Sequence, residues 1–575
     1  MQAGAKQLMD IKTLHDADII GISTAKSAFD TLATAFGQHI ESWQHDVVDR
    51  LGHSEWTGTA AGHANTRISN LGTELQAAKQ ELGLVSRALQ DAYDGFAAAQ
   101  AHLISALDDA KKQKLTVADD GGITWDKDPN SPNFAGNDAE NQAKQIQSRI
   151  TAALNEADHA DQTISSRLGH LATNASNGTG LDSATAKADT DAANALEQVP
   201  AAGTDPNSVK AWWNGLTDEQ QHRMILNHPD QIGNLDGIPA VARNDANRIN
   251  LARGKQDIQR QLDGLGPAPA TTIGSGRFIR PNPAYTDWQQ KHDDLTDKMT
   301  GIKAIEARLN TKVDDQHPPT FLLGFDTNGH GHAIIAVNNP DTANNVSTYV
   351  PGTGARLGSI NSDINRSDLM VASANTANRQ AGDKSTTSSI TWVGYDAPQS
   401  IIPEAADDTY AKNAEDKLVS FENGLHATHD GKIGNNTILA HSYGTTTVGY
   451  AMRDHGLPVD NAVLIASPGA GVENAKDLRI DPSHVYAAQS PADAIGWAAA
   501  TDPSGVGDNI WDNIKGDWGF GDGDHHLMYG RQTTAPQFGA NVMPVDPNAG
   551  HSDYWNAGSP TLTAMGQVIA GKPMQ

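Results

Sequence analysis

The chain has 575 residues, of which 38% are hydrophobic, and 42 basic against 69 acidic residues give a net charge of −27. This length predicts several domains. The acidic balance argues against nucleic-acid binding and against electrostatic docking on anionic membranes, since both need basic surfaces. The sequence has no cysteine, which excludes disulfides, thiolate metal sites and a cysteine nucleophile.

The N-terminal residues lack the apolar core of a secretory signal, and no stretch reaches the roughly 20 apolar residues of a membrane helix. We therefore expect no integral membrane segment. The protein is expected to be either cytoplasmic or exported without a cleaved signal peptide.

The first third of the chain is predicted to be helical. From Ala25 to Leu51, apolar residues recur every three or four positions, as on one face of an amphipathic helix. After a break at GHSEWTGTAAG, a second stripe from Ile68 to Leu107 is close to a heptad repeat. Two long helices joined by a short turn form an antiparallel hairpin or coiled coil, which a third helix near 138–171 would complete.

The turn of this hairpin holds Trp56-Thr57-Gly58. Helix–Trp-x-Gly–helix resembles the small helical-hairpin proteins associated with type VII secretion in Gram-positive and actinobacterial cells. The resemblance implies an oligomer, homo- or hetero-, formed through the N-terminal helices. Such export usually depends on a Tyr-x-x-x-Asp/Glu signal after the second helix. None follows here, and the match at Tyr450–Asp454 falls in an expected core helix.

The middle of the chain is expected to be helical with loops. LTVADDGGITWDKDPNSPNFAGND predicts a loop, because it is polar and rich in Gly, Pro, Asp and Asn. A helix is expected to start near Thr217, with Trp212 and Trp213 in an apolar packing face. GPAPATTIGSGRFIRPNP predicts a linker before a last helix at Trp288–Leu309.

After Pro318 the pattern changes to short apolar runs. TFLLGFD and HAIIAVNN, separated by TNGHG, predict a β-hairpin. Helices are expected near 410–423 and 445–455. Buried strands alternating with helices indicate a mainly parallel α/β sheet. The further predicted strands lie in STYVPGTG, SSITWVGYDAP, NTILAHS, NAVLIASPG, HVYAAQS and FGANVMPVD.

The stretch AHSYG at 440–444 follows one of these strands and precedes a helix. A G-x-S-x-G turn in this setting exposes a nucleophilic serine at the carboxyl edge of the sheet, and alanine is small enough to replace the first glycine. Ser442 is therefore the predicted nucleophile, and the amide of Tyr443 a predicted oxyanion donor. The alternative is an ordinary strand–helix turn. His441 is expected to pack locally and receives no catalytic role.

A serine needs a base held by an acid, and in this fold the chain order is Ser, acid, His. Asp493 follows the strand 485–489, and His551 follows the last predicted strand, so both satisfy the order. The acids and bases that compete with them are Asp481, Asp502, Asp546, His525 and His526.

The glycines of VPGTG allow backbone amides to turn toward an oxyanion, so Gly352, Thr353 and Gly354 are the other predicted donors, although a tight strand-end turn is the alternative. GDGDHH at 521–526 is interpreted as a solvated loop rather than a metal site, and no cofactor is expected. Trp497–Gly530, rich in Gly, Asp and Trp, is the candidate for a lid.

The motifs from LDGIPAVARNDANR through WVGYDAP and AHSYGT to SPADAIG and GHSDYW resemble an actinobacterial α/β-hydrolase family long catalogued as a domain of unknown function. The resemblance covers about 212–571 and implies Ser442, Asp493 and His551 as the triad. The predicted fold is multidomain, an all-α N-terminal region followed by an α/β-hydrolase. The expected parts are a helical hairpin at 1–115, helical segments with loops at 116–205, a helical lead-in at 206–317 and the catalytic domain at 318–575.

These motifs favour a serine hydrolase that acts on a carboxylic ester with an apolar acyl side, ahead of an amide or a thioester. The alternative is an exported interaction protein or toxin, in which the hairpin is a secretion or partner module and the hydrolase attacks lipids. A third hypothesis is a hydrolase fold kept for binding alone, which the intact triad order disfavours.

Overall fold

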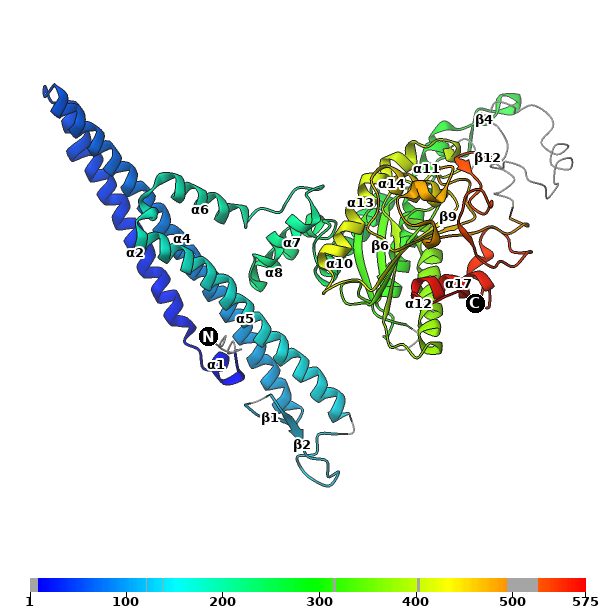
Figure 1. Cartoon of the computed structure of the whole chain (residues 1–575), viewed down its shortest axis with the longest axis horizontal. Helices are drawn as coiled ribbons and strands as arrows, with labels where there is room; N and C mark the ends of the chain where they lie inside the picture. The colour runs from blue at the N-terminus through cyan, green and yellow to red at the C-terminus, as the bar shows by residue number, and fades with distance from the viewer. Residues whose placement is uncertain are drawn as a thin grey trace. The chain divides into compact units, whose positions relative to one another are not determined.

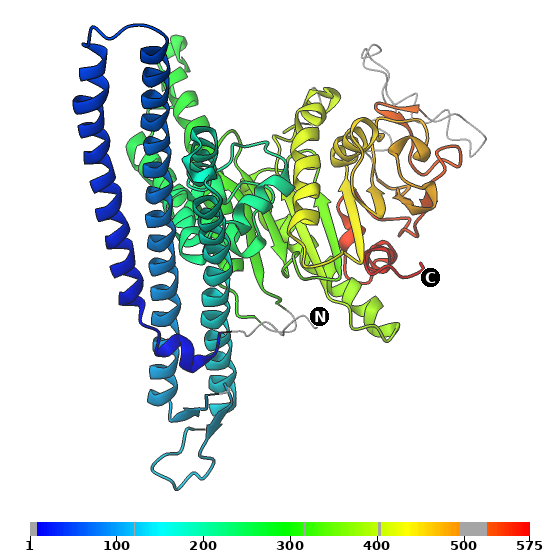
Figure 2. The same ribbon diagram turned by 60° about the vertical axis from the view of Figure 1, so that its left-hand side comes forward.

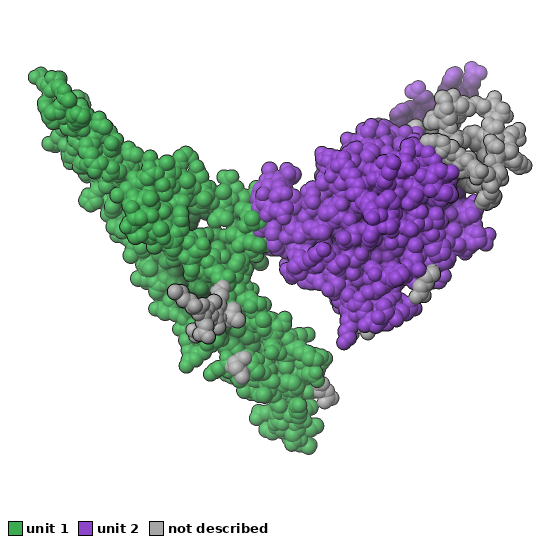
Figure 3. Space-filling model, viewed as in Figure 1, with its two compact units in different colours: residues 1–199, 211–224 green, residues 200–210, 225–575 purple. Residues whose placement is uncertain are grey.

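The computed structural model describes residues 9–119, 121–136, 138–313, 317–400, 404–493 and 526–574. The chain divides into two compact units (Figure 3). A helical unit comprises 1–199 and 211–224, and a sheet unit comprises 200–210 and 225–575. Most of the predicted lead-in therefore belongs to the same unit as the predicted catalytic region. The four-part division of the chain stays a prediction.

The helical unit is built on the two long arms of the predicted hairpin, α2 (Ile19–Trp43) and α4 (Thr59–Lys112). A third helix, α5 (Ala139–Asn177), packs along α4 (Figure 1). Several alanines where the two helices meet, such as Ala106 and Ala153, are fully buried, because small side chains let the helix axes approach closely. Other segments of this unit are the short helix α1 (Ile11–His15), a π-helical stretch (Gln44–Asp49), α3 (Arg50–Gly52) and α6 (Ser183–Ala195).

Trp56 lies in the turn between α3 and α4, and 51% of its surface is exposed. Gly58 has φ +104°, a conformation that favours glycine, and α4 begins directly after it. The hairpin and its turn are thus present. The resemblance to secretion-associated hairpins stays a prediction.

The segment after α4 differs from the expected loop. It contains an antiparallel pair, β1 (Leu115–Val117) and β2 (Ile123–Trp125), in which Leu115 lies opposite Trp125. Apolar residues alternate with threonine in both strands, which flank a turn that includes Gly121, and Leu115 is buried in the core between α4 and α5. The overall polarity of the stretch concealed this pattern.

Over the described residues, the main sheet of the sheet unit has eight strands in the order β14-β11-β10-β9-β7-β8-β6-β5. The pairs from β14 to β8 are parallel, whereas β6 and β5 form the predicted hairpin and join antiparallel. The mainly parallel sheet is therefore confirmed. The strands are β5 (Thr320–Asp326), β6 (His332–Val337), β7 (Asn345–Val350), β8 (Thr387–Val393), β9 (Asn435–His441), β10 (Asn461–Ile465), β11 (Val485–Ala488) and β14 (Asn541–Val542).

Helices cover both faces of this sheet (Figures 1 and 2). The helices α13 (Thr409–Thr428) and α14 (Tyr443–Asp454) pack on one face, where Ile438 and Ala440 of β9 point. The helices α12 (Ile360–Gln380) and α17 (Pro560–Ile569) pack on the other, where Leu439 points. Successive residues of a strand face opposite sides, so β9 is buried on both.

The sequence did not predict α12, because its residues are mostly polar. Several of those polar side chains are nevertheless buried: Ser367, for example, is hydrogen-bonded to Thr391 of β8 at 2.8 Å between the two hydroxyl oxygens. Hydrogen bonding to the sheet thus adds to the apolar contacts of α12, such as those of the buried Ile364 and Met370.

Two lead-in helices, α10 (Ala240–Leu265) and α11 (Pro283–Leu309), belong to the sheet unit, and α10 lies against the edge strand β5. The main-chain N–H of Leu322 donates to Asn244, and the Leu322 carbonyl accepts from Asn247. The Asn234 side chain accepts from the Phe325 main-chain N–H and donates to the Phe325 carbonyl. Side-chain amides thus form hydrogen bonds with the backbone groups that an edge strand leaves unpaired.

Smaller elements of the sheet unit are α9 (Pro229–Ile232), β3 (Thr272–Ile273), β4 (Arg280–Pro281), β12 (His526–Leu527) and β13 (Gly530–Arg531). The helices α7 (Pro206–Asn214) and α8 (Asp218–Asn227) lie where the chain passes between the units.

Candidate active site

Three parallel strands end together at the carboxyl edge of the sheet. Ala440 of β9 pairs with Val350 of β7, and His441 pairs with Ile465 of β10. The segments that follow these strands therefore meet around Ser442. This edge is where open α/β sheets bind their ligands.

Ser442 stands between β9 and α14 with φ +56° and ψ −133°. A non-glycine residue with positive φ is uncommon, and such strain concentrates at functional sites. Two neighbours hold the conformation. The Ser442 amide donates to Ile465 at 2.9 Å, and the Ser442 carbonyl accepts from the Thr445 hydroxyl at 2.7 Å.

Glycines bring a second loop against this turn. A Cβ on Gly352 would lie 2.8 Å from Ser442 Cβ, 2.7 Å from the Tyr443 nitrogen and 2.6 Å from the His441 carbonyl oxygen. A Cβ on Gly444 would collide with the Val350 carbonyl. Only hydrogen fits at either position, so VPGTG packs directly on the strand–helix turn.

Three of the predicted oxyanion amides are available at this place. Among the described residues, the amides of Tyr443, Gly352 and Thr353 donate no hydrogen bond to another residue. Tyr443 is the first residue of α14, and an amide at that position has no acceptor within the helix. The amide of Gly354 differs, because it donates to Pro398 at 2.8 Å. That bond removes Gly354 from the set of free donors.

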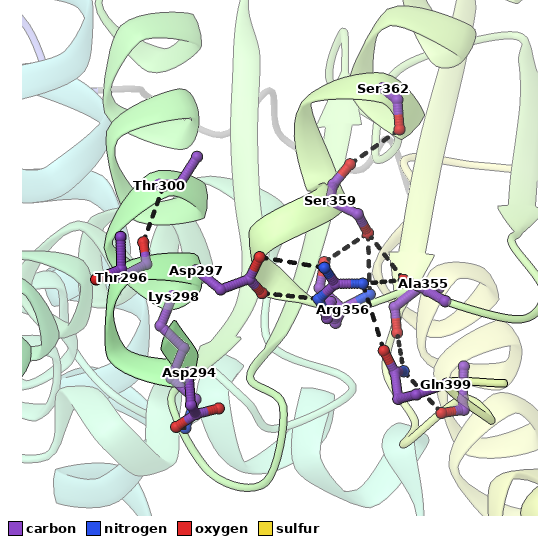
Figure 4. A network of polar contacts seen from close by, with 12 residues as sticks. Asp294, Thr296, Asp297, Lys298, Thr300, Ala355, Arg356, Ser359, Ser362 and Gln399 are labelled. Carbon is purple, nitrogen blue, oxygen red and sulfur yellow. Dashed lines mark hydrogen bonds and ion pairs between the residues drawn. The ribbon is translucent and has the colours of Figure 1, made fainter. Parts of the chain in front are cut away.

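The loop is fixed by an ion pair that reaches across to α11 (Figure 4). Arg356 donates from Nε and Nη2 to the two carboxylate oxygens of Asp297, at 2.7 and 3.2 Å, and from Nη1 to the Gly354 carbonyl at 3.1 Å. Gln399 accepts from the same guanidinium. A lead-in helix thereby anchors the glycine loop beside Ser442.

The predicted acid and base lie together. His551 Nδ1 is 3.0 and 3.1 Å from the two carboxylate oxygens of Asp493, which is fully buried. A carboxylate accepts, so Nδ1 carries a proton, and in the neutral imidazole this tautomer leaves the lone pair on Nε2. Tyr554 also donates to Asp493, at 2.7 Å, and its hydroxyl accepts from the Ser490 amide. Sequence reasoning missed Tyr554, although it lies three residues after His551.

The segment that carries His551 touches the end of β9. His441 Nε2 is 2.8 Å from the His551 carbonyl oxygen, and the two rings are 4.6 Å apart between centroids. Within the described chain, no hydrogen bond joins the Ser442 hydroxyl to His551. The segment that carries His551 thus adjoins His441, the neighbour of Ser442 in the chain, and the triad itself stays a prediction.

The competing residues have other partners or fall elsewhere. Asp481 caps a short helix by accepting from Ser483, and Asp546 accepts from Asn548. Asp502, His525 and most of Trp497–Gly530, the guessed lid, lie outside the described residues, as does most of GDGDHH. In the ranges that the structure describes, no cluster of three or more His, Asp or Glu side chains could hold a metal ion, and no helix is long and apolar enough to cross a membrane.

Comparison with known proteins agrees with this fold. The sequence profile of the alpha/beta hydrolase family matches residues 326–503. An uncharacterized protein of Mycobacterium bovis, Mb0988c, is 30% identical over 235 residues, which are 40% of this chain and 80% of that protein. The chain belongs to the alpha/beta hydrolase family.

A second mycobacterial relative matches a larger share of this chain. The uncharacterized protein Rv2079 of Mycobacterium tuberculosis is 30% identical over 401 residues, 65% of this chain. The hydrolase spans 57% of the length of that relative. Among solved structures, the esterase LipW from Mycobacterium marinum is similar over 48% of this chain and 89% of the LipW chain. The identity is 13% and the TM-score is 0.29.

Proposed function

We propose that this hydrolase cleaves carboxylic esters through an acyl-enzyme formed on Ser442. The proposal rests on one observation. A strained serine, the unpaired amides of Tyr443 and Gly352, and a histidine bound to a buried carboxylate gather at one edge of the sheet. This combination supplies a nucleophile, oxyanion donors and a base held in the right tautomer.

In the proposed reaction, His551 Nε2 takes the hydroxyl proton of Ser442 as Oγ attacks the acyl carbon. The amides of Tyr443 and Gly352 stabilise the oxyanion that forms. His551 then gives the proton to the departing alcohol, leaving the acyl group on Ser442. Water, deprotonated by the same Nε2, attacks the acyl carbon and releases the acid, and the proton returns to Oγ. Asp493 holds the imidazole throughout.

A fluorophosphonate probe tests the nucleophile. We expect wild-type protein to be labelled and Ser442→Ala to remain unlabelled. Ser362→Ala, an exposed serine on α12, is the matched control and should be labelled as wild type is. Equal labelling of Ser442→Ala, or no labelling of wild type, would show that Ser442 is not an activated nucleophile.

The acid is tested by comparing two carboxylates. Asp493→Asn should lower kcat by about 10²–10⁴-fold, because an amide favours the wrong imidazole tautomer. Asp546→Asn, the matched control among the competing acids, should retain turnover. A panel of esters with increasing acyl length then defines the substrate, for which we propose an apolar acyl side.

A second candidate function concerns delivery. The half-exposed Trp56 at the hairpin turn supports the alternative that the helical unit is a secretion or partner module. In that case Trp56→Ala should reduce export from an actinobacterial host without reducing ester hydrolysis. Leu32→Ala, an exposed apolar residue on α2, is the control. Unchanged export in the Trp56 variant would refute this alternative.

A further inference from the structure

His441, the last residue of β9, lies next to the proposed nucleophile in the chain and next to the proposed base in space. Its ring is buried, and its Nε2 lies 2.8 Å from the His551 carbonyl oxygen. A carbonyl oxygen can only accept, so Nε2 of His441 is the donor. This bond joins the end of the strand that precedes Ser442 to the loop that carries His551.

We propose that His441 is a positioning residue, which fixes the main chain of His551 and thereby holds its imidazole toward Ser442. The inference rests on the proposed function, because it assigns His441 to the same reaction. It differs from the expectation of simple local packing, in which the donor would be dispensable.

The ring contacts around His441 favour one orientation. The His551 ring lies 4.6 Å away between centroids, and the Trp555 ring meets His441 edge-on at 5.2 Å. Arg366 lies over the Trp555 ring, at 4.7 Å from its centroid. These contacts leave the imidazole of His441 little freedom to turn away from the His551 carbonyl.

His441 is also kept neutral. Burial, with smaller contributions from His551 and Arg366, holds the pKa of His441 well below its ordinary value. A neutral imidazole donates from one nitrogen only, and the bond to His551 selects Nε2. A second positive charge beside the base would oppose its protonation during the reaction, so a neutral donor suits this place.

The loop of His551 needs such an anchor. Its imidazole is 34% exposed, and among the described residues its ring hydrogen-bonds to Asp493 alone, through Nδ1. That contact holds one edge of the ring but not the main chain that carries it. The bond from His441 adds a second fixed point on the main chain. A displacement of about 1 Å at a reacting group can cost about 10²-fold in rate.

Amide substitutions of different length test the donor. The Nε2 of glutamine can reach the place of the histidine Nε2, whereas the shorter asparagine cannot. We expect His441→Asn to lower kcat by about 10- to 100-fold with little change in KM, and His441→Gln to restore most of the loss. The rate of fluorophosphonate labelling should follow kcat. His441→Phe, which keeps a ring and loses the donor, should resemble the asparagine variant.

A matched control has the same kind of bond elsewhere. His429 Nε2 donates to the Ala343 carbonyl at 2.9 Å, at the opposite edge of the sheet. His429→Phe should keep kcat, which separates a positioning effect from a general loss of a histidine–carbonyl bond. Thermal unfolding identifies any variant that fails to fold, and the Asn–Gln pair still decides if the Phe variant does.

The outcomes separate the two proposals. Wild type that neither labels nor turns over esters refutes the proposed function. Wild type that labels, with His441→Asn equal to it or His441→Gln no better than His441→Asn, refutes only the role of His441. Combining His441→Asn with His551→Ala should cause no loss beyond that of His551→Ala alone, because both act through one imidazole.

Discussion

Replacing Gly352 by alanine tests the glycine loop with the smallest added group. Gly352 does not have a positive φ, so backbone strain is not the issue. The new Cβ would lie 2.6 Å from the His441 carbonyl oxygen and 2.7 Å from the Tyr443 nitrogen, where ordinary contacts begin at 3.4 Å. To restore an ordinary contact distance of 3.4 Å from 2.6 or 2.7 Å, the loop or the turn must move back by about 0.7–0.8 Å.

Such a retreat has two consequences of different size. Overpacking of this kind costs about 1–3 kcal/mol of stability. It also separates the oxyanion amides by a distance that costs about 10²-fold in rate. We therefore expect Gly352→Ala to lose far more kcat than its modest destabilisation would suggest. The assay is kcat and KM on a short ester, with the midpoint of thermal unfolding measured alongside.

The control for this prediction is Gly434→Ala. Gly434 precedes the same strand, β9, at its other end, and its new Cβ would lie 2.9 Å from the Asn344 carbonyl oxygen. It should lower the unfolding midpoint but leave kcat within about threefold. If Gly352→Ala keeps wild-type kcat, or if both variants lose kcat equally, the glycine loop does not position the oxyanion amides.

Two further predictions concern charged side chains in the sheet unit. Arg356→Gln should lower kcat about tenfold, because it releases the Gly354 carbonyl and Asp297. Arg356→Lys should not restore kcat, because lysine lacks the planar guanidinium that binds both groups at once. Full turnover by the lysine variant would contradict this prediction. Burial raises the pKa of Glu422 to about 7, from 4.5, so its stabilising contribution is complete below pH 4.5 and is lost as the pH rises through 7. We expect the free energy of unfolding, measured in urea, to fall more between pH 5 and 8 for wild type than for Glu422→Gln. The two decreases should differ by on the order of 3 kcal/mol at most. Equal decreases in both proteins would exclude Glu422 as the cause.

Much of the sheet unit could be predicted because its strands are short apolar runs bounded by turn residues. The hairpin at TNGHG and the strand before AHSYG follow directly from that pattern. The order Ser, acid, His selected Asp493 and His551, which the structure brings within hydrogen-bond distance of each other. Local patterns were sufficient here, because the chemistry requires these residues at the ends of strands.

The rest could not be predicted, because it depends on tertiary partners. The helix α12 buries serine and aspartate against the sheet, so its apolar periodicity is weak. The roles of His441 and Tyr554 depend on a carbonyl and a carboxylate about 110 and 60 residues away in the chain. No periodicity or short motif encodes such pairings. The same is true of Pro398, whose carbonyl takes the Gly354 amide out of the predicted oxyanion set.

The asparagines that cover β5 have a consequence for solubility. An open sheet edge is a template on which another chain can add a strand, and proteins avoid self-association by blocking it. Here the block comes from Asn234, Asn244 and Asn247, all encoded upstream of the sheet. A fragment cut just before β5 would carry the complete sheet but a bare edge, and we expect it to aggregate. Expression fragments of the catalytic region should therefore begin before Asn234.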